Sequence, residues 1–69
     1  MRNDILLNEM GKQIKSVRKA NKLSLTQLSK LCGVDISNLW FIENARRNVD
    51  ILTLKSIADV FNMDIKELL

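Results

Sequence analysis

Two helix-start signals that stand eleven residues apart, with a glycine between them, constrain the fold of this 69-residue chain more than any other feature. Ser24 and Gln27 have the spacing of a capping box, in which the serine oxygen accepts a hydrogen bond from a helix amide and the glutamine side chain bonds back to the cap amide. Asp35 is a second N-cap residue, and Gly33 tolerates the left-handed backbone that ends a helix. The sequence therefore predicts two short helices separated only by a tight turn.

The first of these helices is predicted to begin at Leu25 and to end at Cys32, and the second to run from Ile36 to about Asn44. Apolar residues recur in both at helical spacing, which predicts the side that faces the core. The residues expected to face inward are Leu28, Leu31, Leu39 and Ile42.

Three further helices complete the prediction, and no β-strand is needed. The first runs from about Asp4 to Ala20, a fourth begins after the N-cap Asp50, and a short last one covers Ile65 to Leu69 after a capping box formed by Asp64 and Glu67. Their inward-facing apolar residues are Leu7, Met10, Ile14 and Val17 in the first helix and Leu54, Ile57, Ala58 and Phe61 in the fourth. The expected fold class is all-α, a compact five-helix bundle with a helix-turn-helix.

The length allows one domain, residues 1–69, with a small core. Hydrophobic residues make up 46% and charged residues 28% of the chain, which is typical of globular proteins and unlike disordered ones. A domain of this size buries only about 60% of the surface that its unfolded chain exposes. Because the core is small, association of two copies would add stability.

Residue types that catalysis and metal binding commonly use are scarce. The chain has no histidine and a single cysteine, Cys32, which excludes an intramolecular disulfide, the usual zinc sites and histidine-based acid–base catalysis. It contains no acid pair in a catalytic motif and no glycine-rich phosphate loop. The sequence therefore predicts a protein that is not an enzyme and uses no cofactor, metal or small-molecule ligand.

Two features bear on where the protein acts. The apolar run 5–7 is too short for a signal-peptide core or a membrane span. A lone thiol at Cys32 suits a reducing compartment; we interpret it as a small core residue, with a redox switch as the alternative. Both features favour a cytoplasmic protein that does not contact a membrane.

Charge is distributed unevenly along the chain, although the net charge is only +3. Between residues 10 and 47 there are eight bases and two acids, a balance of +6, whereas residues 50–69 carry four acids and two bases, a balance of −2. The eight bases are Lys12, Lys15, Arg18, Lys19, Lys22, Lys30, Arg46 and Arg47. A polyanion that binds the basic segment explains this pattern, and a solvated charged face explains it equally well.

Two short helices joined by a tight turn, with a polar outer face on the second, are what a helix-turn-helix needs to place a helix in the DNA major groove. The chain strongly resembles the lambda-repressor and Cro-like domains of the Xre family from about Met10 to Leu69, and within that family the restriction-modification controller proteins. The matching positions are Met10–Ile14, Val17–Arg18, Leu23–Ser24, Gln27–Ser29, Gly33–Asp35, Leu39, Ile42–Asn44, Arg47–Asn48, Asp50, Leu54, Ile57–Ala58, Asp64 and Glu67–Leu69. The controller subfamily is suggested by the run from Arg46 to Asp50, which has no insertion and no proline.

The resemblance implies that the helix starting at Ile36 is the recognition helix. It places the base-reading side chains at Ile36, Ser37, Asn38 and Phe41. Serine and asparagine bond to base edges and apolar groups pack on thymine methyls, so an A·T-rich site is expected. Ile36, Phe41 and Leu25 depart from the family, which often has polar residues at the first two positions and usually glutamine at the third.

Phosphate contacts are predicted for polar and basic residues at the helix ends that flank the recognition helix, with solvated surface residues as the alternative. These residues are Lys22, Thr26, Asn44, Arg46, Arg47 and Asn48. The family resemblance also implies a partly buried salt bridge between Arg18 and Glu43 that ties the recognition helix to the first helix.

The leading hypothesis is a transcriptional regulator that binds double-stranded DNA as a homodimer and reads a palindromic operator. The last two helices carry more apolar residues than one buried stripe needs, which predicts a dimer interface at Val49, Ile51, Leu52, Val60, Met63 and Leu69. The alternative is a protein-interaction module of the antitoxin or anti-repressor type, in which Trp40 and Phe41 bind a partner protein. One or both of these aromatic residues could instead turn into the core.

Overall fold

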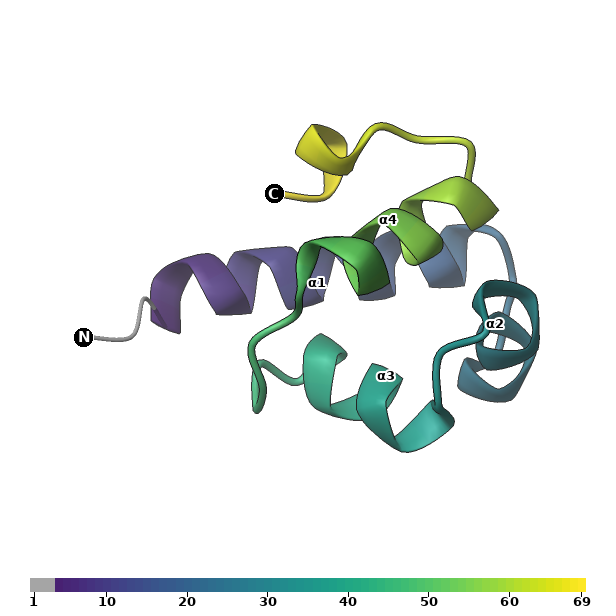
Figure 1. The fold of residues 1–69 in the computed structure, drawn as a ribbon, viewed down its shortest axis with the longest axis horizontal. Helices are drawn as coiled ribbons and strands as arrows, with labels where there is room; N and C mark the ends of the chain where they lie inside the picture. Colours follow the sequence, from purple (N-terminus) through teal and green to yellow (C-terminus); the bar gives the residue numbers. More distant parts are fainter. Residues whose placement is uncertain (1–3) are drawn as a thin grey trace.

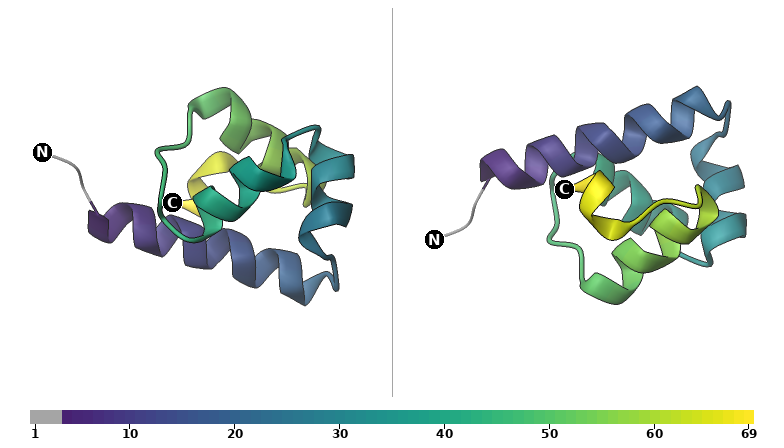
Figure 2. Two further views of the ribbon diagram at one scale, coloured as in Figure 1. Left: turned by 90° about the horizontal axis from the view of Figure 1, so that it is seen from below. Right: turned by 90° about the horizontal axis from the view of Figure 1, so that it is seen from above.

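The structure is a computed structural model that describes residues 4–69, and the regular elements in this part of the chain are all helices, without a strand. The elements in chain order are α1 (Asp4–Ala20), α2 (Leu25–Cys32), α3 (Ile36–Glu43), α4 (Ile51–Val60) and the 3₁₀ helix η1 (Ile65–Leu68). In Figure 1, α1 spans the length of the molecule, α2 closes one end, and α3 and η1 lie on opposite sides. The views from below and above in Figure 2 agree, with α3 facing the viewer in the first and η1 in the second.

The prediction of five α-helices is wrong for the last element. The segment after Asp64 makes a single 3₁₀ turn, in which the Leu69 amide bonds to the Lys66 carbonyl three residues back. Glu67 still reaches back to accept a hydrogen bond from the Asp64 amide at 2.7 Å. Four residues are too few to establish the i to i−4 bonding of an α-helix, so the tighter turn forms instead.

The capping residues set the helix boundaries as the sequence predicts. The Gln27 amide donates to Ser24 Oγ at 3.1 Å, and Gln27 Oε1 accepts from the Ser24 amide at 2.8 Å, which completes the capping box. Gly33 ends α2 in the left-handed region at φ +73°, with its amide bonded to the Ser29 carbonyl. Two residues later, Asp35 caps α3 by accepting from the Ser37 amide at 3.1 Å. These contacts fix the conformation of the turn between α2 and α3.

Among the residues that the structure describes, ten buried apolar ones form the core, and they come from every element. They are Leu7, Met10, Ile14, Leu28, Leu39, Ile42, Leu54, Ile57, Ala58 and Leu68. Val17 and Phe61, which we expected to face inward, are partly buried against this core.

The prediction that Leu31 faces inward is wrong, because its side chain is 61% exposed. The stripe of α2 that packs on the core consists instead of Leu25, Leu28 and Cys32, which are three and four residues apart. In a helix of eight residues, both choices of stripe satisfy the helical period, so periodicity alone does not distinguish them.

None of the helices in residues 4–69 is long and apolar enough to cross a membrane.

Asp50 caps α4, and its carboxylate gives this cap a pH dependence. Asp50 Oδ1 accepts a hydrogen bond from the Thr53 amide at 3.1 Å, and the hydrogen bonds with Thr53 lower the pKa of Asp50 below its usual value of 3.8. The folded state therefore favours the ionised carboxylate. The stabilisation is fully present above pH 3.8 and is lost as the pH falls through the lower pKa of the folded protein.

We expect the stability advantage of the wild type over Asp50→Asn to shrink on acidification. Asparagine also caps helices but does not titrate, so the variant isolates the charge of the cap. Urea unfolding of both proteins at about pH 6 and about pH 3 measures the difference. An equal difference in stability at both pH values would show that the charge of Asp50 does not contribute to the stability of the protein.

Candidate nucleic-acid interface

α3 is half buried, so that one side anchors it and the other faces solvent. Leu39 and Ile42 are 0% and 2% exposed and pack into the core. On the other side, Ile36 and Trp40 are 41% and 45% exposed, and Ser37 is exposed as well. A helix held in this way presents a fixed outer surface, which is what insertion into a DNA groove requires.

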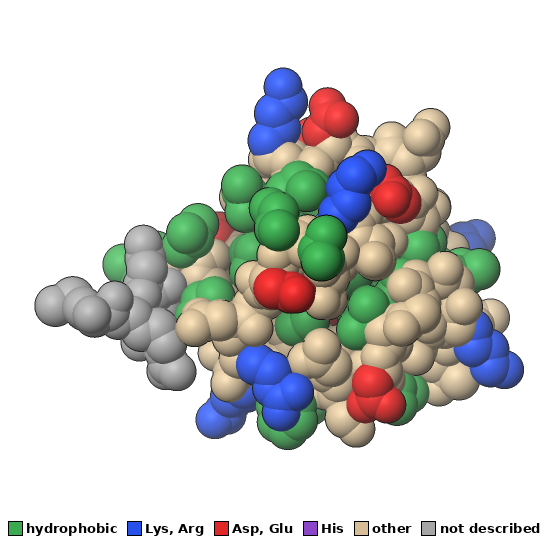
Figure 3. Space-filling model, in the orientation of Figure 1, with side chains coloured by type: hydrophobic (Ala, Val, Ile, Leu, Met, Phe, Trp, Pro, Cys, Tyr) green, Lys and Arg blue, Asp and Glu red, His purple; other side chains and the backbone are tan. Residues whose placement is uncertain are grey.

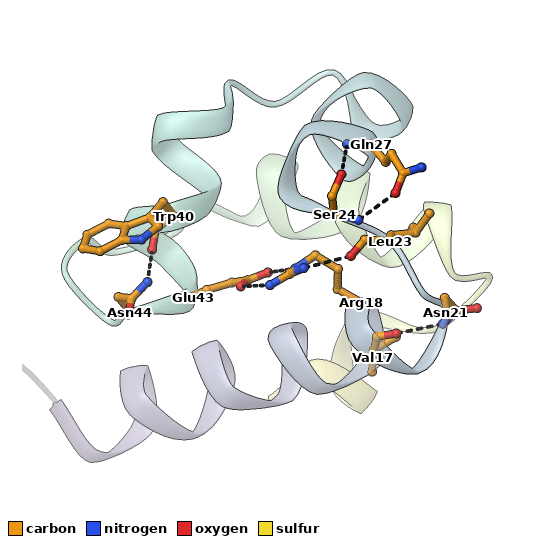
Figure 4. A network of polar contacts seen from close by, with 9 residues as sticks. All are labelled: Val17, Arg18, Asn21, Leu23, Ser24, Gln27, Trp40, Glu43 and Asn44. Atoms are coloured by element: carbon orange, nitrogen blue, oxygen red, sulfur yellow. Dashed lines mark hydrogen bonds and ion pairs between the residues drawn. The ribbon is translucent and has the colours of Figure 1, made fainter.

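A buried ion pair fixes α3 against α1 (Figure 4). Arg18 Nε and Nη2 donate to the two carboxylate oxygens of Glu43 at 2.7 and 2.9 Å, and Arg18 Nη1 donates to the Leu23 carbonyl at 2.8 Å. Arg18 and Glu43 are only 8% and 7% exposed. The hydrogen bond to Glu43 raises the pKa of the Arg18 guanidinium and outweighs the effect of burial, which lowers it. The ion pair that the family resemblance implied is thus present as a bidentate contact between two helices.

Gly11 brings α1 and α3 together at a second point. The glycine is buried, and a Cβ atom built on it would lie 2.7 Å from both the Ile42 and the Glu43 carbonyl oxygens. The backbone of α3 therefore approaches α1 more closely than any side chain allows. The sequence shows no sign of this contact, because a glycine inside a helix carries no periodic pattern.

The four residues proposed to read bases differ in how accessible they are. Ile36 and Ser37, at the start of α3, are exposed, whereas Asn38 and Phe41 are partly buried. Phe41 packs edge-to-face on Trp40, with ring centroids 5.4 Å apart and an angle of 84° between the planes. Neither aromatic residue is part of the buried core.

Asn38 and Phe41 also contact Arg47, which lies beyond the end of α3. Arg47 Nη1 donates to Asn38 Oδ1 at 3.1 Å, and the Arg47 guanidinium carbon lies 4.4 Å from the centroid of the Phe41 ring. Sequence reasoning assigned Asn38 and Phe41 to base reading and Arg47 to phosphate contact, and it did not anticipate that the three would form one cluster.

The residues proposed for phosphate contact are at the surface. Lys22, Thr26, Asn44, Arg46, Arg47 and Asn48 are all exposed. Asn44 Nδ2 donates to the Trp40 carbonyl at 2.9 Å, so this side chain caps the end of α3 in the free protein (Figure 4). Lys22 has a left-handed backbone at φ +58°, in the turn where α1 gives way to α2.

The excess of basic residues between residues 10 and 47 lies at the surface. Arg18 and Glu43 neutralise each other in the buried ion pair. The other seven bases of this segment and the remaining acid, Asp35, are exposed, so seven positive charges and one negative charge leave the same balance of +6 at the surface. This surface charge is suited to attract a polyanion.

The residues proposed as a dimer interface fall into more than one group. Val49, Ile51 and Leu69 line one apolar groove together with Leu6 and Met10. Figure 3 shows hydrophobic side chains gathered on the face that carries α4 and the C-terminal turn. Ile51, Leu52 and Leu69 are 64%, 74% and 60% exposed.

Val60 lies elsewhere on α4, in a depression lined by Leu31, Cys32, Ser56 and Asp59. Val60 and Met63, like Val49, are partly buried against the core, whereas Ile51, Leu52 and Leu69 are exposed. The six residues therefore do not line a single groove: Ile51 and Leu69 are exposed in the first, and Leu52, also exposed, lines neither.

These features define a small helix-turn-helix protein of the lambda-repressor or Xre type, in which buried contacts hold one recognition helix at the surface. The helix-turn-helix family model HTH_3 matches residues 14–68, and the chain belongs to this family. The family is one of DNA-binding regulators and not of enzymes.

Several solved structures are similar to this chain, and two of them show the extent of the similarity. The restriction-modification controller protein C.AhdI from Aeromonas hydrophila is 28% identical and has a TM-score of 0.87; the match covers 91% of this chain and 96% of that protein. An HTH_3 family transcriptional regulator from Vibrio cholerae is also 28% identical, with a TM-score of 0.88; the match covers 94% of this chain but only 36% of the Vibrio protein. No curated protein is similar enough to count as a match.

Proposed function

We propose that this protein is a transcriptional regulator that binds double-stranded DNA in a sequence-specific manner through the outer side of α3. The observation that carries the proposal is the fixed position of α3. Its inner side is buried in the core, and the Arg18–Glu43 ion pair ties it to α1. The similarity to a restriction-modification controller protein and to a transcriptional regulator supports the same function. Such a protein acts in the cytoplasm, where bacterial DNA lies, and needs no cofactor.

The contacts with DNA divide by position. Ile36 and Ser37, at the exposed start of α3, reach base edges, and Asn38 and Phe41 line the same part of the groove. Exposed residues at the flanking helix ends bind phosphates and fix the register of the helix on the duplex. Those residues are Lys22, Thr26, Asn44, Arg46 and Asn48.

We further propose that two copies associate through the apolar groove that Ile51 and Leu69 line, and that the dimer reads a palindromic operator. The exposed apolar side chains of Ile51 and Leu69 in this groove, together with that of Leu52, the residue after Ile51, give a small domain a means to enlarge its core. In a two-fold dimer of helix-turn-helix domains, the recognition helices contact half-sites about one turn of DNA apart. The groove adjoins the proposed phosphate contacts at Asn48, which lines it, whereas Ile36 and Ser37 at the start of α3 are not part of its lining.

Selection from a pool of random 30-bp duplexes tests this function. We expect the retained DNA to be enriched in a palindrome, because two identical recognition helices read two identical half-sites. We also expect the logarithm of the affinity to fall linearly with the logarithm of the salt concentration, with a slope of about −0.9 per neutralised phosphate.

The other outcomes separate the alternatives. Salt-sensitive binding without an enriched sequence would contradict sequence-specific recognition. Enrichment of a single half-site without symmetry would contradict the proposed dimer but not sequence-specific recognition. If no duplex is retained, the exposed Trp40 and its neighbour Phe41 would instead favour a surface that binds a partner protein.

A further inference from the structure

The loop after α3 folds back toward the helix that it leaves. Ala45 has a left-handed backbone at φ +56°, and the Arg46 amide donates to the Phe41 carbonyl at 2.8 Å, five residues back. This pair of features reverses the chain at the end of α3. As a result, the next residue, Arg47, lies over α3 and does not continue away from it.

Two residues of α3 hold the Arg47 side chain from different directions. Asn38 Oδ1 accepts a hydrogen bond from Arg47 Nη1 at 3.1 Å, and the Arg47 guanidinium carbon lies over the Phe41 ring, 4.4 Å from its centroid. Asn38 and Phe41 are three residues apart, so they lie on the same side of the helix. Phe41 is itself in edge contact with Trp40. These contacts favour one orientation of a side chain that otherwise has high rotational freedom.

The position of this guanidinium distinguishes a base contact from a phosphate contact. A residue four positions beyond the end of α3 would by default lie near the C-terminal end of the helix. The hydrogen bond to Asn38, the third residue of α3, draws Arg47 back over the N-terminal half. In helix-turn-helix proteins that half of the recognition helix contacts the base edges.

The donors that remain on Arg47 suit a guanine. A guanidinium has five N–H groups, of which the contact with Asn38 uses one, and the edge formed by Nε and Nη2 stays available. Two parallel donors of this kind match guanine O6 and N7, which is the commonest specific contact in the major groove. We therefore propose that Arg47 reads a guanine in each half-site and that Asn38 and Phe41 are positioning residues for it. This proposal rests on the proposed function, and it adds a G·C pair to each half-site of the A·T-rich operator that the sequence predicts.

Selection from the same random 30-bp pool, repeated with variants, tests the proposal. We expect the wild type to enrich a guanine in each half-site and Arg47→Ala to lose that preference while keeping the rest of the site. Arg46→Ala is the matched control, because it removes the adjacent exposed arginine. It should weaken binding to all duplexes alike and leave the preferred sequence unchanged.

Replacement of the enriched guanine by 7-deazaguanine tests the contact atom directly. The wild type is expected to lose about 10-fold in affinity, since the analogue lacks the N7 acceptor but still pairs normally. Arg47→Ala should bind both duplexes equally. Phe41→Leu should reduce the discrimination between them, and Phe41→Tyr, which keeps an aromatic face for the guanidinium, should restore it.

Three results would overturn the proposal. The first is an enriched site without guanine, and the second is an unchanged guanine preference in Arg47→Ala with uniformly weaker binding, which identifies a phosphate contact. The third is the absence of any enriched sequence with the wild type, which would refute sequence-specific recognition itself and is thereby distinguishable from the first two. Thermal melting of each variant, followed by circular dichroism, checks that the fold is retained.

Discussion

Replacing Glu43 with alanine is expected to destabilise the protein by about 3–5 kcal/mol, because it leaves the buried Arg18 charge without its partner. A domain of this size has a total stability of only about 3–10 kcal/mol, at roughly 0.05–0.15 kcal/mol per residue. We therefore expect a fall in Tm of more than about 10 °C, or a largely unfolded protein at ambient temperature. Thermal and urea unfolding followed by circular dichroism measure the loss.

Two controls separate the buried charge from other effects of the substitution. Lys55→Ala breaks an exposed ion pair with Asp59 on α4 and should leave the Tm nearly unchanged, since solvent screens that pair. The double variant Arg18→Met and Glu43→Leu removes both charges and should recover much of the lost stability. A Glu43→Ala protein that melts at the wild-type temperature would refute the structural role of the pair.

Replacing Gly11 with alanine is expected to destabilise the protein, although alanine favours helix by about 1 kcal/mol over glycine. The new methyl group would lie 2.7 Å from two carbonyl oxygens of α3, and these are backbone atoms that cannot rotate away. Overpacking of this kind costs about 1–3 kcal/mol or more, and the rigid neighbours place this site at the upper end. We expect a net loss of about 2 kcal/mol, measured by urea unfolding.

Lys12→Ala is the matched control for this substitution, because Lys12 is the next residue of α1 and its side chain is exposed. It should change the stability by no more than about 0.5 kcal/mol, as is usual for surface positions. If Gly11→Ala were instead more stable than the wild type, helix propensity would outweigh the clash. That result would show that α1 and α3 do not approach each other as closely at Gly11 as the structure describes.

Much of the fold follows from local signals in the sequence. Ser24, Gly33, Asp35 and Asp50 each end or begin a helix where the structure has one, because capping depends on residues that are close in the chain. The core residues of α1 and α4 follow from their helical period for the same reason. The all-α helix-turn-helix class is therefore predictable.

Other features depend on contacts between elements and leave no local signal. Leu31 satisfies the helical period yet is exposed, and the last segment is a 3₁₀ turn although it carries capping residues. Gly11 is explained only by the position of α3 across from it. Burial in a small domain is decided by which elements meet, and this information lies in the tertiary structure.

The arrangement of the candidate site was only partly predictable. The resemblance to a known family implied the Arg18–Glu43 pair, and the structure contains it. The cluster of Asn38, Phe41 and Arg47 depends on a left-handed backbone at Ala45, where the sequence has no glycine to indicate it. For that reason, the sequence led only to a phosphate contact for Arg47, as for its neighbour Arg46.

The central claim is that the outer side of α3 is the DNA-binding surface, and amide chemical-shift mapping by NMR tests it most directly. Isotope-labelled protein would be titrated with the duplex retained in the selection, and with a scrambled duplex as the control. We predict that the largest shift changes fall at the start of α2, along α3 and in residues 45–48. Changes confined to α4 and the C-terminal turn, or equal changes with both duplexes, would contradict the account.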